Sequence, residues 1–186
     1  MKKFSWIFAL ILALSMAFVF AGCGEEPSNP GVNDGTGPGV RYKFSSLTIP
    51  TGTLDDTALA PFHLKISGNA VVSYVDGVFK VDPNGRTEDY HCLDVLKSAW
   101  EDFDPPFEFT VKGEMVDGGA LKLGQAGPTG FYGVIKAAGG ALNAGDEFEI
   151  TATITKSNLT GTDGIRIQSS AAPSKSFIVT EILIVK

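Results

Sequence analysis

Alternation of apolar and polar residues dominates the chain from residue 41 onward. Two segments, 107–116 and 147–156, show it most clearly, with phenylalanine, valine, isoleucine or methionine at alternating positions and glutamate, threonine or lysine between them. Successive strand residues point to opposite faces of a sheet, so this period of two predicts half-buried antiparallel strands. The last segment, 176–185, is apolar on both faces except at Thr180 and Glu181, which predicts a central strand.

Other short β-branched and aromatic runs, bounded by Gly, Pro, Asn and Asp, predict further strands. The full set of predicted strands is 42–48, 62–67, 70–75, 78–82, 90–96, 107–116, 120–125, 131–136, 147–156, 164–168 and 176–185. Helical periodicity is nearly absent, apart from a turn or two of helix between Asp94 and Phe103. Many short strands separated by turn residues predict an all-β fold, an antiparallel β-sandwich (jelly roll).

The N-terminus has a different pattern. A basic end, Met1-Lys2-Lys3, precedes an apolar run from Phe4 to Ala21. This arrangement is typical of a secretory signal. A retained membrane helix is the alternative, because the run approaches the ~20 residues that a span needs. Small residues at the end of the run, with no basic residue directly after them, favour the signal.

The segment Phe20-Ala21-Gly22-Cys23 resembles the bacterial lipobox, although Phe20 stands where Leu or Val is usual. The resemblance implies cleavage before Cys23 and lipidation of Cys23; a plain secreted protein is the alternative. Two or three acyl chains on one cysteine would hold the protein firmly at a membrane. We therefore expect an extracytoplasmic, membrane-anchored lipoprotein at the cell surface or outer membrane.

Composition divides the chain into a signal peptide (1–22), a lipidated cysteine with a flexible linker rich in Gly, Pro, Ser and Asn (23–40), and one sandwich domain (41–186). Loss of residues 1–22 leaves 13 of the 15 basic residues and all 21 acidic ones, a net charge of −8. That charge argues against nucleic acid as a partner. With Cys23 lipidated, no second cysteine remains for a disulfide with Cys92, which we expect to be a small buried residue. We expect a monomer.

Motifs of enzymes are missing from the sequence, which contains no Gly-x-Ser-x-Gly, His-Glu-x-x-His, phosphate-binding glycine loop or Cys-x-x-Cys. Glycoside hydrolysis needs a carboxylate pair in a cleft with the pKa of one acid raised, and the pattern predicts no such cleft. Trp100 lies close to Phe103 in sequence, where packing is the default interpretation. The residues therefore indicate a non-catalytic protein without a cofactor or a catalytic metal.

Polar and planar side chains fall on strand faces that the core does not use. In 164–168 the two isoleucines point inward, which places Arg166 and Gln168 on the outer face. The same alternation places Tyr90 and Tyr132 on the outer faces of their strands. Such side chains suit a sugar, because an aromatic plane contacts the C–H face of a pyranose and amide or guanidinium groups bind pairs of hydroxyls. Ordinary surface decoration is the alternative for each residue taken alone.

Residues 84–95, Asn-Gly-Arg-Thr-Glu-Asp-Tyr-His-Cys-Leu-Asp-Val, resemble a motif of carbohydrate-binding modules of families 4, 9, 16 and 22. Segments 107–112 and 177–184 are similar to two further strands of those modules. The resemblance implies a jelly-roll sandwich that binds plant or microbial polysaccharide in a groove on its concave sheet.

Position by position, the resemblance implies a set of groove residues: Arg86, Tyr90, Gln125, Tyr132 and Gln168. Tyr90 falls where the family has a stacking tryptophan, and Cys92 replaces a glycine of the motif. Thr180-Glu181 replaces an Asp-Asp pair whose first member commonly holds a structural calcium in the family, which argues against calcium here.

Three functions remain open. The first is a non-catalytic, polysaccharide-binding surface lipoprotein whose ligand is of the xylan, mannan or β-glucan type. A structural or protein-interaction envelope lipoprotein with no glycan ligand is the second. Hydrolysis is the third, and release of reducing sugar from a polysaccharide would identify it.

Overall fold

The computed structural model describes residues 39–84, 92–127, 130–169 and 174–186, and the side chains of Arg41, Phe131 and Tyr132 fall outside that description. Its strands are β1 (Gly39–Lys43), β2 (Gly52–Leu54), β3 (Leu64–Ser67), β4 (Val71–Val75), β5 (Val78–Asp82), β6 (Cys92–Leu96), β7 (Phe107–Met115), β8 (Leu121–Gly127), β9 (Gly130–Ala137), β10 (Glu147–Ile154), β11 (Gly164–Ser169) and β12 (Phe177–Val185). Short helical segments connect them: η1 (Phe44–Ser46), α2 (Asp56–Leu59), η2 (Ala60–Phe62), η3 (Lys97–Trp100) and α3 (Lys156–Leu159).

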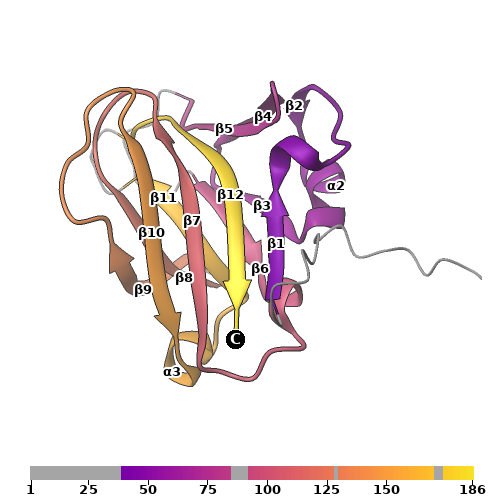
Figure 1. The fold of residues 1–186 in the computed structure, drawn as a ribbon, viewed down its shortest axis with the longest axis vertical. Helices are drawn as coiled ribbons and strands as arrows, with labels where there is room; N and C mark the ends of the chain where they lie inside the picture. Colours follow the sequence, from indigo (N-terminus) through magenta and orange to yellow (C-terminus); the bar gives the residue numbers. More distant parts are fainter. Residues whose placement is uncertain (1–38, 85–91, 128–129, 170–173) are drawn as a thin grey trace, which may run out of the picture.

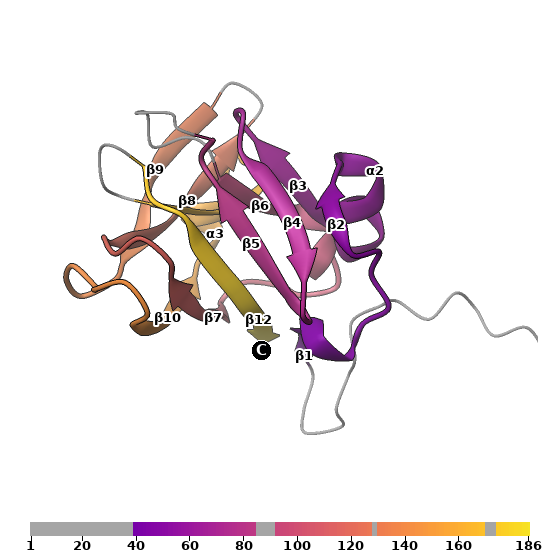
Figure 2. The same cartoon turned by 90° about the horizontal axis from the view of Figure 1, so that it is seen from above.

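Two antiparallel sheets face each other across the core (Figure 1). The seven-stranded sheet has the order β10-β7-β12-β5-β4-β2, with β1 also paired to β12, and the five-stranded sheet has the order β3-β6-β11-β8-β9. Seen from above, α2 lies beside β2, on the side of the molecule away from β9 and β10 (Figure 2). The predicted fold class, an antiparallel β-sandwich (jelly roll), is confirmed.

Alternation along β7 and β10 matches the prediction from sequence. Phe107, Phe109 and Val111 are buried in β7, and β10 alternates strictly between exposed and buried positions. On the outer face of this pair, the Thr110 and Thr151 hydroxyls are 2.9 Å apart, and Lys112 Nζ lies 3.2 Å from Glu149 Oε2. One face of these two strands therefore builds the core and the other faces solvent, as their period of two requires.

Strand β12 is central, as its apolar sequence predicts. It pairs with β7 along one side, and on the other side with β5 through residues 177–179 and with β1 through residues 181–185. Its register against β7 shifts between Val179 and Glu181, and the Thr180 hydroxyl donates to the Lys112 carbonyl at 3.2 Å. The polar pair that interrupts the apolar sequence thus lies at a β-bulge.

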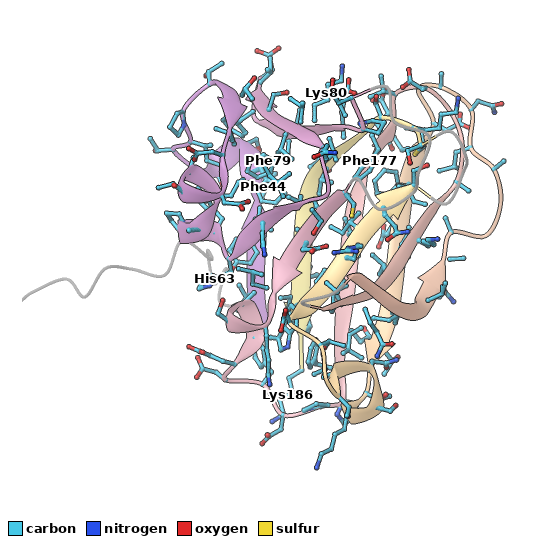
Figure 3. All side chains as sticks on the ribbon, turned by 180° about the vertical axis from the view of Figure 1, so that it is seen from behind. Phe44, His63, Phe79, Lys80, Phe177 and Lys186 are labelled. Atoms are coloured by element: carbon cyan, nitrogen blue, oxygen red, sulfur yellow. The ribbon has the colours of Figure 1, made fainter. Side chains whose placement is uncertain are left out.

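Aromatic rings fill the space between the sheets. Phe44 and Phe79 meet edge to face with centroids 4.5 Å apart, and both lie in the interior in Figure 3. Trp100 is buried against Phe107 at 5.8 Å and Phe109 at 6.4 Å. The packing interpretation of Trp100 is confirmed, and these contacts connect η3 to the core.

Five elements were not predicted from the sequence: β2, α2, η1, η2 and α3. The predicted strand 42–48 is wrong beyond Lys43, because residues 44–46 form η1. Strand β2 has only three residues, too few to show a period of two. Helix α2 has four residues and begins after Asp55, whose carboxylate accepts a hydrogen bond from the Ala58 amide at 2.8 Å. The turn of helix expected between Asp94 and Phe103 is present as η3. None of the helices in the described ranges is long and apolar enough to cross a membrane.

Candidate functional site

The face of the five-stranded sheet that points away from the other sheet is called here the outer face. A row of residues crosses all five strands on this face. Figure 3 looks onto the molecule from this side. Because Leu93 and Ile167 belong to the core, their strand neighbours Asp94 and Arg166 point outward. The strand register aligns one residue from each strand into the row: Lys65, Asp94, Arg166, Gly124 and Val134.

A buried ion pair occupies the middle of this row. Arg166 Nε lies 2.7 Å from Asp94 Oδ1, and Arg166 Nη2 lies 2.8 Å from Asp94 Oδ2, so the guanidinium grips the carboxylate with two parallel bonds. Arg166 Nη2 also donates to the Ser67 hydroxyl at 2.9 Å, and that hydroxyl donates to Asp94 Oδ2. The cluster of Ser67, Asp94 and Arg166, called here the polar clamp, joins β3, β6 and β11 through their side chains.

Register confirms the expected face for Arg166 and Gln168, but burial differs from the expectation. Both lie on the outer face of β11, yet Arg166 is 4% exposed and Gln168 is 1% exposed. Alternation identifies the face of a strand but not what covers that face. An arginine directly opposite an aspartate on the neighbouring strand also has a charge partner at hand, which favours the clamp over solvent.

The predicted position of Gln125 in the groove is wrong. It pairs with Ile165 across β8 and β11 and follows Leu121 and Leu123 at a period of two, so it lies on the face opposite Arg166 and Gln168. Its amide Nε2 donates to the Asn158 carbonyl of α3 at 2.7 Å. Gln125 therefore cannot share a groove with Gln168, and the alternation of β8 was the signal that would have shown this.

The structure does not describe the side chains of the other three predicted site residues. Arg86 and Tyr90 lie outside the described residues, and Tyr132 belongs to β9 but its side chain is not described. Cys92 is fully buried on the outer face beside Ser67, as expected for a small interior residue. Lys65 and Val134 are exposed on the same face, so solvent reaches the two ends of the row.

A cavity of about 700 Å³ lies at one edge of the sandwich, and no sequence pattern predicts it. Its walls come from β1, the segment after η1, η2 and the chain from η3 onward, which are far apart in sequence. The lining residues are Val40, Leu47, Thr48, Ala60, Pro61, Phe62, His63, Ser98, Ala99, Trp100, Glu101, Asp102 and Phe103. His63 lies where η2 turns into β3, and His63 Nδ1 is 2.8 Å from the Ser98 hydroxyl. Such a cavity can bind a small polar ligand.

Within the described ranges, no group of three or more His, Cys, Asp or Glu side chains is arranged to hold an ion. Thr180 and Glu181 lie at the β12 bulge, where Glu181 is 9% exposed and the Thr180 hydroxyl donates to the Lys112 carbonyl.

No protein-family model matches the chain, and no curated protein matches it significantly. Among solved structures, the CBM22-1 and GH10 modules of Clostridium thermocellum N-terminal endo-1,4-beta-D-xylanase 10B, complexed with xylohexaose, match at 16% identity with a TM-score of 0.49, over 67% of this chain and 26% of that chain. This chain thus spans about a quarter of that protein.

Two further matches are single modules. The CBM22-1 xylan-binding domain of Paenibacillus barcinonensis Xyn10C matches at 12% identity and a TM-score of 0.46, over 75% of this chain and 99% of that chain. A family 29 carbohydrate-binding module of Piromyces equi matches at 14% identity and a TM-score of 0.43, over 80% and 92%. These structures contain carbohydrate-binding modules, the kind of protein that the motifs at 84–95, 107–112 and 177–184 resemble.

Proposed function

We propose that this chain is a non-catalytic, polysaccharide-binding lipoprotein whose sandwich holds a xylan-, mannan- or β-glucan-type chain on the outer face of the five-stranded sheet. One observation carries the proposal. The polar clamp and Gln168 stand on that face, whereas the other face of the same strands is built from core residues such as Leu93 and Ile167. These side chains are almost fully buried and the clamp residues bond one another, so they support the proposal by holding the strands of a polar face in place and not by offering free hydrogen bonds to a ligand.

The clamp acts as a frame in this proposal. Because the guanidinium of Arg166 is committed to Asp94 and Ser67, it fixes the spacing of three strands. A rigid frame lowers the ordering cost that binding would otherwise carry. Direct contacts then come from the exposed ends of the row at Lys65 and Val134, and from the aromatic platforms that the resemblance assigns to Tyr90 and Tyr132.

Affinity electrophoresis on gels containing xylan, mannan or β-glucan tests the proposal. We expect retardation on at least one of them. Tyr90→Ala should weaken binding by about 1–3 kcal/mol if its ring is a stacking platform, as for aromatic hot spots, and Tyr132→Ala should behave alike. Thr153→Ala, on the exposed face of β10, is the control that should migrate as the parent does.

Unretarded migration of folded protein on every glycan would refute the proposal. Co-purification of one stoichiometric envelope protein in the same preparation would then favour an interaction lipoprotein. Reducing sugar released during incubation would instead contradict its non-catalytic character.

Anchoring through Cys23 completes the proposed function, because a binder of insoluble polymer is useful to a cell when it is fixed to that cell. We expect Cys23→Ala to prevent incorporation of an alkynyl fatty acid during growth and to leave the protein out of the membrane fraction. A Ser28→Ala variant in the linker is the control. Equal fatty-acid labelling of the Cys23→Ala chain and the control would show that the anchor is elsewhere.

A further inference from the structure

The cavity at the edge of the sandwich is separate from the outer face. It opens where β3 begins and where η3 follows β6, and a backbone hydrogen bond from the Leu96 amide to the His63 carbonyl, 2.7 Å long, closes this end of the sheet. Its volume of about 700 Å³ falls in the range of roughly 300–1,000 Å³ of small-molecule sites.

Hydrogen-bonding groups surround the opening. Thr48, Ser98, Glu101 and Asp102 are all exposed to solvent, and His63 Nδ1 bonds the Ser98 hydroxyl at 2.8 Å. Hydroxyls, an imidazole and carboxylates offer both donors and acceptors to a ligand. The cavity therefore suits a molecule that carries many hydroxyl groups.

Charge narrows the class of ligand. Glu101 and Asp102 line the cavity, and none of its described lining residues is a lysine or an arginine. An anionic ligand would meet two carboxylates and no cation, which disfavours phosphates and uronic acids. A neutral polyhydroxyl ligand meets no such repulsion, and the carboxylates are strong acceptors for its hydroxyl protons.

Aromatic carbon forms the inner wall. Phe103 is half-buried and rests on Phe107 with ring centroids 6.3 Å apart. Trp100 lies deeper, 2% exposed, and its indole nitrogen has no hydrogen-bond partner among the described groups of the protein. Trp100 and Phe103 both line the cavity, so their rings offer an apolar surface to the C–H face of a sugar and place an indole where binding can be detected.

We propose that this cavity is a second saccharide site, which takes a short neutral saccharide or the end of a neutral glycan chain. The inference rests on the proposed function, because it assigns the same class of ligand to a different part of the domain. The loops that wall the cavity meet at the edge of the sandwich, so it accommodates an end, whereas the outer face offers five adjacent strands to an extended chain.

Trp100 provides the readout, because the chain has two tryptophans and the other, Trp6, lies in the signal. The full chain with Trp6→Phe, purified in a detergent without a sugar headgroup, has Trp100 as its sole indole. We expect xylohexaose, cellohexaose or mannohexaose to shift its fluorescence in a saturable manner. An oligomer of galacturonic acid should cause no shift.

Charge-neutralising variants test the lining. Glu101→Gln combined with Asp102→Asn should weaken the fluorescence-detected binding of the neutral hexasaccharide by about tenfold or more, because hydrogen bonds to charged acceptors are lost. In the same variant, the difference in affinity between the neutral hexasaccharide and the galacturonic acid oligomer should become smaller. Glu108→Gln, an exposed carboxylate on β7 outside the cavity, is the matched control and should bind as the parent does.

Calorimetry on the same samples separates this inference from the proposed function. Hexasaccharide binding that calorimetry detects, with silent Trp100 fluorescence and no effect of the double variant, would overturn the second site and leave the proposed function standing. No binding of any glycan by either method would overturn both. Binding detected by Trp100 that weakens in the double variant but not in Glu108→Gln supports the second site.

Discussion

Asp94 and Arg166 show how two residues determine the character of the outer face. Both are at most 5% exposed, and their carboxylate and guanidinium are joined by two bonds of 2.7 and 2.8 Å. A buried charge is costly unless its partner remains, so the pair acts as a unit in which neither member tolerates loss of the other.

Removal of one member of the pair should therefore destabilise the domain strongly. We expect Asp94→Ala to cost about 3–5 kcal/mol, because it leaves the Arg166 charge buried without its carboxylate. Asp94→Leu combined with Arg166→Met should cost less than Asp94→Ala alone. Urea denaturation followed by circular dichroism measures the stability of both variants. Equal stability of Asp94→Ala and the parent would show that Arg166 can remain buried without its carboxylate at no cost.

The phenol of Tyr42 is buried in the core. Burial raises the pKa of its phenol from 10.0 to about 12. The unfolded chain then loses this proton at lower pH than the folded chain, so stability is intact below pH ~10 and falls as pH rises from about 10 to about 12. Two pKa units correspond to at most about 3 kcal/mol.

Tyr42→Phe isolates that effect. The Tyr42 hydroxyl is buried with no hydrogen-bond partner among the described groups, so its removal should raise stability by about 1 kcal/mol at neutral pH. The gap between variant and parent should widen between pH 10 and 12 in thermal unfolding. A constant gap across that range would contradict the raised pKa.

Individual elements follow the sequence closely where a period of two is long enough to read. Each predicted strand overlaps an observed one, and β4, β5, β7 and β12 agree within one residue at either end. Strand β2 and helix α2 were not predicted, because three or four residues are too few to show the periodicity of a strand or a helix. The groove position that the resemblance implies for Gln125 is wrong, because the alternation of β8 places Gln125 on the same face as Ile165 of β11.

The bulge in β12 depends on a close approach that a side chain would block. A Cβ at Gly113 of β7 would lie 1.8 Å from the Ile178 carbonyl oxygen and 2.6 Å from the Phe148 ring. Backbone cannot yield as a flexible side chain can, so Gly113→Ala should cost about 3 kcal/mol or more. Gly139→Ala meets nothing within 4 Å and serves as the control, with a change within about 0.5 kcal/mol. Similar urea midpoints for the two variants would contradict the packing at β7 and β12.

At the scale of the whole molecule, the sequence predicts the sandwich but only part of the candidate sites. The face that carries Arg166 and Gln168 follows from alternation, whereas their burial depends on what lies over the sheet. The edge cavity is lined by four separate segments between Val40 and Phe103. No local sequence pattern can predict that such distant segments come together. Sites formed by distant segments become visible when the strand order is known.

One measurement tests the central claim directly, that the outer face of the five-stranded sheet binds a polysaccharide. Backbone amide chemical shifts of the isotope-labelled chain are followed by NMR while a neutral hexasaccharide that retards the protein is added. We predict saturable shifts at amides of β6, β8 and β11 around the polar clamp, with the amides of β10 unmoved. Saturation of the protein with saccharide while the amides of β6, β8 and β11 stay unmoved would contradict the claim.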